Sequence, residues 1–305
     1  MNNVLSVKNL TKNYGNFVAV DHISFSVAKG EIVGLLGPNG AGKTTTIQML
    51  LDITIPDSGE IKYFGKEFHT HREEILGRIN FASAFNTLQG RNSTWENLMV
   101  FAKLYNVKNP KKKILDLLEQ FEISDSINMR YWDMSAGQKT RVNIIKSLLN
   151  DPEIILFDEP TASLDPDIAE KTISYIESLR KSGDISLLYT SHDMNEVTRL
   201  CDRVIFINHG KIVAEDSPLN LTKKIGTAKL VLRFDGDKNT VEEYIKKEKK
   251  EYEFLNNYTV SISSEEKDIP SLIFGVSKQE IWITDIEVKK PTLEDFFLSI
   301  ARTNI

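Results

Sequence analysis

The residues with the clearest chemical potential form a glycine-rich segment directly after an apolar run. Residues 37–45 read Gly-Pro-Asn-Gly-Ala-Gly-Lys-Thr-Thr, between the apolar run 32–36 and a helix-like stretch at 46–51. This order fits the phosphate-binding loop pattern G-x-x-x-x-G-K-[ST], which lies between a strand and a helix. Glycines let such a loop turn tightly, so that backbone N–H groups and the positive end of the helix dipole face phosphate oxygens. The candidate phosphate-binding residues are Gly37, Asn39, Gly40, Ala41, Gly42, Lys43, Thr44 and Thr45.

Two side chains of this loop have distinct predicted roles. The ammonium of Lys43 can reach the β- and γ-phosphates of a nucleotide, and the hydroxyl of Thr44 can ligate Mg²⁺. The alternative is a glycine-rich turn that binds nothing. We disfavour that alternative because strand, loop and helix occur in the order that the pattern requires.

Two carboxylates stand at the end of a second apolar run. Residues 154–159 read Ile-Ile-Leu-Phe-Asp-Glu, and four apolar residues in a row suit a central parallel strand buried on both faces. A parallel sheet places its ligands beyond the carboxyl ends of its strands, where the phosphate-binding loop also lies. Asp158 is therefore predicted to help hold Mg²⁺, and Glu159 to polarise a water aimed at the γ-phosphate. Taken alone, the pair would equally suit a solvated acidic turn.

Further motifs resemble those of the ATP-binding-cassette (ABC) ATPases, over about residues 3–220. Residues 134–138, Met-Ser-Ala-Gly-Gln, resemble the family's signature, which is usually Leu-Ser-Gly-Gly-Gln. Residues 163–165, Ser-Leu-Asp, are similar to its D-loop, and residues 190–193, Thr-Ser-His-Asp, to its switch-histidine segment. Tyr14 stands where the family stacks an aromatic ring on adenine. The motifs follow the family's order and spacing, which makes the set specific.

The resemblance implies ATP and Mg²⁺ as ligands and a head-to-tail dimer, in which the signature of one subunit caps the ATP held by the other. His192 would then contact the γ-phosphate and orient the attacking water together with Glu159. A serine hydroxyl and free N–H groups before the predicted helix 139–149 form a second anion site. Without the other motifs, residues 134–138 would be read as an ordinary helix cap. The further nucleotide-binding residues implied are Tyr14, Ser135, Gly137, Gln138 and Asp165.

The chain departs from the family in the segment after residues 79–83. The family has a glutamine there that touches Mg²⁺ and the attacking water, whereas this sequence has Ala84. Asn86 and Gln89 are the candidate substitutes. A milder departure is Ala136, which is one methyl larger than the family's glycine.

Length and composition bound the class of protein. A chain of 305 residues accommodates one large and one small domain, and a formal net charge of −5 argues against a nucleic-acid-binding surface. No apolar run approaches the ~20 residues that cross a bilayer, and the N-terminus lacks the features of a signal peptide. We therefore expect a cytoplasmic protein, peripheral on the cytoplasmic face of the cell membrane, that needs a separate membrane partner.

The spacing of apolar residues predicts an α/β protein with two domains. Residues 1–222 are expected to form the ATP-binding domain, with short strands at 3–36 in an N-terminal antiparallel sheet and an inserted helical subdomain at about 85–150. The resemblance implies that this domain is a P-loop NTPase core of the ABC type. The pattern breaks near 222–226, and residues 226–305 mix strands and helices as a small α+β domain.

The sequence thus predicts the ATP-hydrolysing motor subunit of an ABC transporter, which works as a homodimer or heterodimer with an integral membrane permease. Residues 291–297 resemble the end of an accessory domain common on exporter-type ABC ATPases, which favours an ABC-2 exporter. The alternative is a non-transport ABC ATPase acting on nucleic acid or ribosomes. We disfavour this alternative because ABC translation factors usually carry two cassettes in one chain, whereas this chain has one. ABC ATPases of DNA repair carry long coiled coils or zinc sites, and the sequence shows neither pattern.

Overall fold

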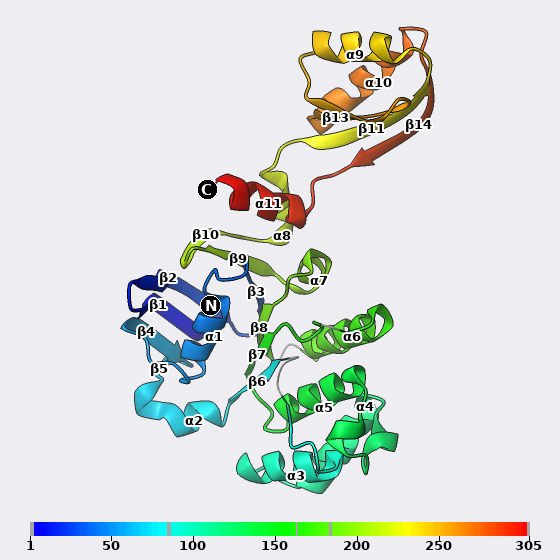
Figure 1. The fold of residues 1–305 in the computed structure, drawn as a ribbon. Coiled ribbons are helices and arrows are strands. Elements are labelled where there is room, and N and C mark those ends of the chain that lie inside the picture. Colours follow the sequence, from blue (N-terminus) through cyan, green and yellow to red (C-terminus); the bar gives the residue numbers. More distant parts are fainter. Residues whose placement is uncertain (1–2, 84–86, 163, 183–184, 304–305) are drawn as a thin grey trace. The chain divides into compact units, whose positions relative to one another are not determined.

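The computed structural model describes residues 3–83, 87–162, 164–182 and 185–303. The chain divides into two compact units, Met1–Pro218 and Leu219–Ile305, each of which is described by itself (Figure 1). The predicted domain limits, residues 222 and 226, lie a few residues beyond this division and stay a prediction.

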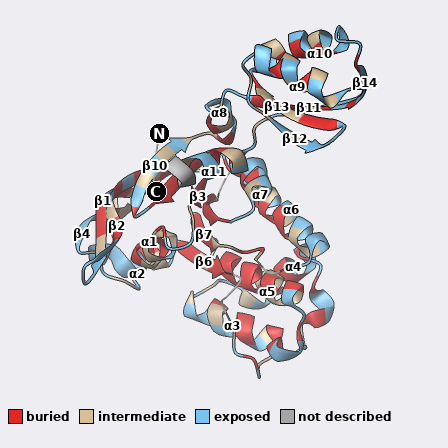
Figure 2. Cartoon of the chain, turned by 45° about the horizontal axis from the view of Figure 1, so that its top comes forward, coloured by how far each residue is buried: buried red, intermediate tan, exposed pale blue. Residues whose placement is uncertain are grey.

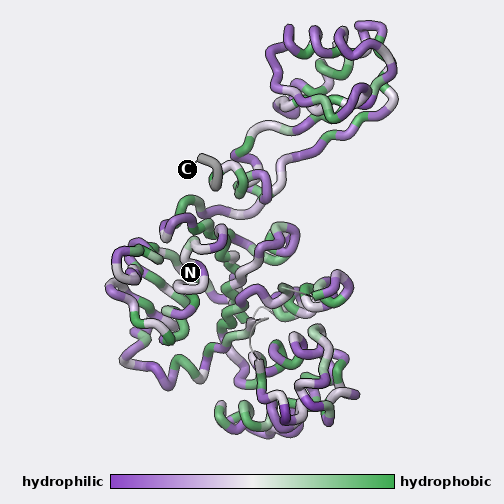
Figure 3. Tube along the Cα trace, viewed as in Figure 1, coloured by the Kyte–Doolittle hydropathy of each residue, from purple (hydrophilic) through white to green (hydrophobic). Residues whose placement is uncertain are grey.

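The centre of the first unit is a six-stranded sheet in the order β10-β9-β3-β8-β7-β6. Its strands run parallel except β10, which is antiparallel to β9. The central strands are buried (Figure 2) and apolar (Figure 3), as expected of parallel strands covered on both faces. The strands are β3 Ile32–Leu36, β6 Ile79–Ser83, β7 Ile154–Asp158, β8 Ser186–Thr190, β9 Arg203–Asn208 and β10 Lys211–Asp216.

A second, antiparallel sheet has the order β2-β1-β4-β5. The expectation of short strands at 3–36 is wrong for this sheet, because β1 and β2 have 12 residues each. Asn9 and His22 adopt positive φ angles of 48° and 52°, and register shifts at such points let the two strands stay paired where simple alternation breaks. The strands are β1 Asn3–Tyr14, β2 Phe17–Ala28, β4 Ser58–Tyr63 and β5 Lys66–Glu67.

Helices fill the space between and beside these sheets. Ile47, Met49 and Leu50 of α1 belong to one apolar core with residues of both sheets, so α1 lies between them. Figure 1 shows α6 and α7 on the other side of the six-stranded sheet. The helices are α1 Lys43–Leu50, α2 Arg72–Leu76, α6 Pro166–Ser182 and α7 Met194–Leu200, with a short 3₁₀ turn η1 at His69–His71.

A helical segment is inserted between β6 and β7. Apolar spacing predicts helices near 95–105 and 111–121, and the structure has α3 and α4 there. The helix after the signature starts earlier than predicted, because Ser135 caps it directly. The elements are α3 Thr94–Leu104, α4 Pro110–Gln120, η2 Ser124–Ser126, η3 Tyr131–Asp133 and α5 Ala136–Leu148.

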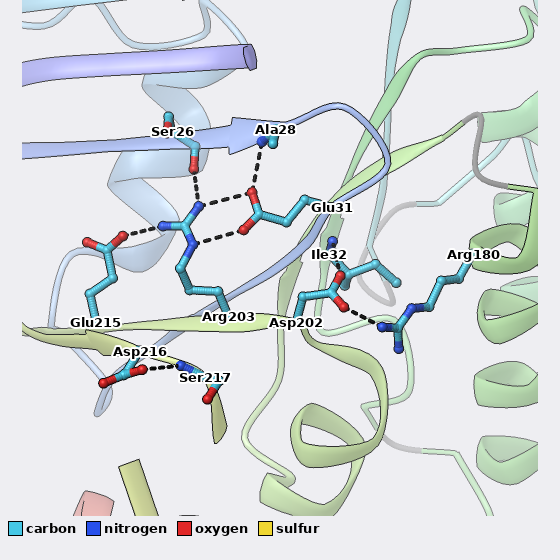
Figure 4. Close-up of polar contacts among 10 residues, drawn as sticks. All are labelled: Ser26, Ala28, Glu31, Ile32, Arg180, Asp202, Arg203, Glu215, Asp216 and Ser217. Carbon is cyan, nitrogen blue, oxygen red and sulfur yellow. Dashed lines mark hydrogen bonds and ion pairs between the residues drawn. The ribbon is translucent and has the colours of Figure 1, made fainter. Parts of the chain in front are cut away.

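Arg203, the first residue of β9, joins the two sheets of this unit (Figure 4). Its guanidinium donates to both carboxylate oxygens of Glu31, at 2.9 and 3.0 Å, and to the carbonyl of Ser26 at 2.7 Å. It also pairs with Glu215 of β10. Bidentate arginine–carboxylate pairs fix geometry as well as charge. The contact therefore holds β2 against the six-stranded sheet, and the β1–β2 hairpin with it.

Lys146 ties α5 to β6 from a buried position, 7% exposed. Its ammonium donates to the carbonyl of Phe81 at 2.6 Å and to Asn80 Oδ1 at 3.3 Å, and lies 5.7 Å from the ring centre of Phe101. Burial lowers the pKa of this lysine to about 8, because a charged ammonium loses hydration there. The side chain thus links the signature helix to the strand that leads to residue 84.

This pKa predicts a pH-dependent contribution to stability. Because the pKa of Lys146 in the folded chain lies below the usual lysine value of 10.5, the unfolded chain binds more protons between these two values, and stability rises with pH. From pH 7 to pH 9, the free energy of unfolding of the wild type should gain about 1 kcal/mol relative to Lys146→Met. Urea titration followed by tryptophan fluorescence, in a Trp282→Phe background so that Trp95 and Trp132 report, measures this difference.

A matched control is Lys171→Met, which changes an exposed lysine of α6. This variant should track the wild type at both pH values. An equal offset between wild type and Lys146→Met at pH 7 and pH 9 would contradict the prediction.

The second unit is a four-stranded antiparallel sheet in the order β12-β13-β11-β14. Side chains of α9 and α10 share one apolar core with β11 and β13, which gives the predicted α+β arrangement. Sequence patterns missed β12, whose residues are mostly exposed, and the six-residue helix α8. The elements are α8 Pro218–Lys223, β11 Ala228–Asp235, α9 Lys238–Lys247, β12 Tyr252–Asn256, β13 Thr259–Ser264, η4 Glu266–Asp268, α10 Ile269–Ser277, β14 Trp282–Lys289 and α11 Leu293–Thr303.

Candidate nucleotide-binding site

The predicted phosphate-binding loop lies at the carboxyl end of β3 and borders a cavity of about 590 Å³. This volume lies in the range of small-molecule sites. Close backbone contacts require glycine at two positions. A Cβ on Gly37 would lie 2.1 Å from the carbonyl oxygen of Ile207, and one on Gly42 would lie 2.4 Å from that of Ala19. The predicted residues that line the cavity are Tyr14, Asn39, Gly40, Ala41, Gly42, Lys43, Thr44, Thr45, Asp158 and Glu159.

Lys43 is held within the loop by backbone carbonyls. Its ammonium donates to the carbonyl of Gly37 at 2.6 Å and to that of Pro38 at 3.2 Å. Burial lowers the pKa of Lys43, while the charges of Glu159 and Asp158 act in the opposite direction. The lysine is therefore a partly desolvated cation whose field is stronger than it would be in water.

Asp158 presents a buried carboxylate to the same cavity. Its Oδ1 accepts a hydrogen bond from the Thr190 hydroxyl at 2.7 Å. Burial is the main cause that raises the pKa of Asp158, and the neighbouring charge of Glu159 raises it further. Burial and the like charge of Glu159 both disfavour the ionised form of Asp158, so a cation beside it would be stabilising. The Asp158 carboxylate and the Thr44 hydroxyl line one cavity and offer the hard oxygen ligands that Mg²⁺ prefers. The residues present thus fit the predicted cation.

Glu159 is aimed by an unusual backbone conformation. Its φ angle is +50°, and its N–H donates to the carbonyl of Thr190 at 3.1 Å and to the Thr190 hydroxyl at 3.0 Å. Its Oε2 lies 3.4 Å from Nδ1 of His192. The Glu159 side chain is 23% exposed and that of His192 is 74% exposed. The two predicted catalytic residues, which are far apart in sequence, therefore lie side by side.

Sequence patterns missed two residues of this site. Thr190 stands in the switch-histidine motif, but only the fold shows its hydroxyl between Asp158 and Glu159. Phe17 pairs with Tyr14 across the β1–β2 hairpin, and both exposed rings line the cavity. An aromatic residue three positions after Tyr14 was the available signal for Phe17.

The predicted signature residues do not line this cavity in the single chain. The Ser135 hydroxyl accepts from the N–H of Gln138 at 3.2 Å, and Gln138 Oε1 accepts from the N–H of Ser135 at 2.9 Å. The interpretation of Gly137 and Gln138 as residues before a helix is therefore wrong: they belong to its first turn. Gly137 is buried against Ile168, where a Cβ would meet Cγ2 at 2.5 Å.

The other predicted positions divide between described and undescribed parts of the chain. Asp165 is exposed at the start of α6, where its carbonyl accepts from the N–H groups of the next turn. Gln89 is fixed by backbone hydrogen bonds to the side chain of Asn97 and is not among the described residues that line the cavity. Ala84 and Asn86, like Ser163 of the D-loop, lie outside the described residues.

Comparison with known proteins decides the family. A family model described as ABC transporter matches residues 20–162. The chain is 37% identical over 226 residues to the Nod factor export ATP-binding protein I of Ralstonia nicotianae, covering 73% of this chain and 70% of that protein. The chain belongs to the ABC transporter family. It is also 31% identical to the linearmycin resistance ATP-binding protein LnrL of Bacillus subtilis, over 98% of both chains.

A solved structure agrees with this membership. CbiO1 of Clostridium perfringens, part of the ABC transporter complex CbiONQ, is 25% identical and has a TM-score of 0.65, covering 74% of this chain and 95% of that one. The predicted ABC ATPase fold and an ATPase activity coupled to transport are thereby confirmed. ABC ATPase subunits of transporters work with membrane permease subunits. Among the described residues, no helix of this ABC ATPase is long and apolar enough to cross a bilayer.

Proposed function

We propose that this ABC ATPase is the motor subunit of an exporter, which binds ATP with Mg²⁺ in the cavity beside Lys43 and hydrolyses it at Glu159. The observation that carries the proposal is the meeting of Lys43, Asp158 and Glu159 in one cavity, with Nδ1 of His192 lying 3.4 Å from Glu159 Oε2. A cation, a buried carboxylate and a partly exposed carboxylate are the groups that hydrolysis of a phosphoanhydride needs.

Each residue has a separate task in this chemistry. Lys43 neutralises phosphate charge, and Thr44 and Asp158 hold Mg²⁺, which would supply Lewis-acid polarisation of the phosphates when bound. Glu159 accepts the proton of the attacking water. His192 lies within reach of Glu159, so that the two residues together orient this water. The Thr190 hydroxyl bonds to both the Asp158 carboxylate and the Glu159 N–H, and so fixes the positions of the two residues relative to each other. Tyr14 and Phe17 offer aromatic faces on which the adenine ring of ATP can stack.

Export is supported by the named relatives. One is a Nod factor export ATP-binding protein, and a bacitracin transport ATP-binding protein of Bacillus licheniformis is 37% identical over 224 residues. The proposed setting is the cytoplasmic face of the cell membrane, against a separate permease. Co-expression with a candidate permease from a neighbouring gene tests this setting, and we expect co-purification and stimulated ATP hydrolysis. ATPase activity that depends on nucleic acid, without a membrane partner, would instead favour a non-transport ABC ATPase.

The position of the signature supports a head-to-tail dimer. Ser135 is exposed at the start of the 13-residue helix α5, outside the cavity bordered by Lys43. A helix N-terminus of this length attracts anions. A second copy, placed by a twofold axis, would bring its α5 to the phosphates of the first and form two equivalent sites.

Ser135→Arg should therefore abolish ATP-driven dimerisation and hydrolysis while each monomer still binds ATP through its intact loop. The bulky cation would stand where the partner's γ-phosphate docks. Analytical ultracentrifugation with ATP and a phosphate-release assay measure both effects. Ser178→Arg, at an exposed serine of α6, is the matched control and should behave as the wild type.

Mixing Ser135→Arg with Lys43→Ala sharpens this test. A mixed dimer carries both lesions in one site and none in the other, so partial recovery of hydrolysis is expected if sites are shared between subunits. Normal dimerisation and turnover of Ser135→Arg by itself would contradict the shared site.

A further inference from the structure

Glu196, in the first turn of α7, accepts three hydrogen bonds on one oxygen, from residues at the ends of two neighbouring strands. Its Oε2 accepts from the hydroxyls of Thr161 at 2.9 Å, Tyr189 at 2.8 Å and Ser191 at 2.8 Å. Thr161 follows β7, Tyr189 belongs to β8, and Ser191 follows β8. One carboxylate thus joins the ends of two neighbouring strands to a helix.

The direction of these bonds follows from the donors' surroundings. A carboxylate only accepts, so each hydroxyl must donate its hydrogen to Glu196. The Ser191 hydroxyl oxygen also accepts from the N–H of Asp193 at 3.0 Å, which commits both of its hydrogen-bonding functions. Thr161, Tyr189 and Ser191 are all buried, so water does not readily replace the carboxylate.

This network reaches the chain beside both residues of the proposed chemistry, and none of its four members is among the described residues that line the nucleotide cavity. Thr161 lies two residues after Glu159, and Ser191 directly precedes His192. Glu196 and His192 line a separate hollow between α6 and α7. Because the His192 side chain is 74% exposed and lies 3.4 Å from Glu159, packing alone holds it weakly. Its place is set through the backbone of Ser191 and Asp193.

We propose that Glu196 is a positioning residue that holds His192 beside Glu159. The inference rests on the proposed roles of Glu159 and His192 in hydrolysis. Glu196 bonds to Ser191 on one side of His192 and, through the Ser191 hydroxyl, to Asp193 on the other. The hydrogen bond from Thr161 to Glu196 connects the segment around His192 to the turn that follows Glu159. The expected signature is a change in kcat with little change in KM, since the phosphate-binding loop is untouched.

The test is a double-mutant cycle between Glu196→Gln and His192→Ala, read as kcat and KM for ATP. Glu196→Gln keeps the shape and removes the charge, and kcat should fall about tenfold or more while KM stays within about twofold, because small displacements of reacting groups are costly. In the His192→Ala background, Glu196→Gln should lower kcat by less than about twofold, since the group it positions is already absent. A merely structural role would give equal losses in both backgrounds.

Two further variants keep the test decisive. Ser191→Ala removes one donor and leaves the carboxylate intact, so it should lower kcat without raising KM even where Glu196→Gln folds poorly. Asn195→Ala, at the exposed residue before Glu196 on the same helix, should retain the wild-type kcat.

The outcomes separate this inference from the proposed function. An unchanged kcat in Glu196→Gln and Ser191→Ala, or additive losses in the cycle, would overturn the positioning role while leaving Glu159 and Lys43 as proposed. Wild-type turnover in His192→Ala would instead remove His192 from the proposed chemistry and, with it, the role of Glu196.

Discussion

Glu159→Gln is expected to slow ATP hydrolysis about 10²-fold or more while leaving ATP binding intact, in line with the usual contribution of a general base. Glutamine has the same shape but cannot accept the proton of the attacking water. The backbone conformation should persist, because it depends on the bonds from the Glu159 N–H to Thr190. A phosphate-release assay measures turnover, and equilibrium dialysis with labelled ATP measures binding.

A second readout follows from the proposed dimer. If hydrolysis is what reopens the dimer, Glu159→Gln should accumulate an ATP-bound dimer that elutes early in size-exclusion chromatography. Glu119→Gln, at an exposed glutamate of α4, is the matched control and should turn over ATP normally. Near wild-type hydrolysis in Glu159→Gln would remove this residue from the role of general base.

Lys43→Ala is expected to weaken ATP binding about 10- to 100-fold as well as to abolish measurable turnover. Hydrogen bonds to charged groups contribute about 1.5–3 kcal/mol, which corresponds to this range of affinity. Lys43 now donates to the carbonyls of Gly37 and Pro38, so its ammonium is already positioned in the loop. Isothermal titration calorimetry with ATP measures the affinity.

The comparison with Lys43→Met separates charge from packing, because methionine keeps most of the side chain's length and loses the ammonium. Both variants should bind ATP weakly. If Lys43→Met binds as the wild type does and only Lys43→Ala is weak, the lysine acts by filling space, and the phosphate-binding role of its charge is wrong.

The sequence by itself determined the elements whose signals are local. The phosphate-binding loop is a continuous stretch from Gly37 to Thr45, and the pattern already contains Gly37 and Gly42, the two glycines that close backbone contacts require. The run 154–159 predicted both a buried strand and the carboxylates at its end. Amphipathic spacing placed α3 and α4 almost to the residue. Each of these features is encoded within a short, continuous stretch of residues, so a single sequence is enough to predict it.

Only the tertiary structure decided how distant groups meet. The Thr190 hydroxyl reaches Asp158 across 32 residues, and Thr161 reaches Glu196 across 35. No periodicity reveals such pairs, because they arise where parallel strands end at one edge of a sheet. The same holds for Lys146, whose polar side chain reads as exposed in a helix but is buried against β6. Burial and hydrogen bonding depend on which elements become neighbours, and this is settled by the packing of the whole unit rather than by any segment.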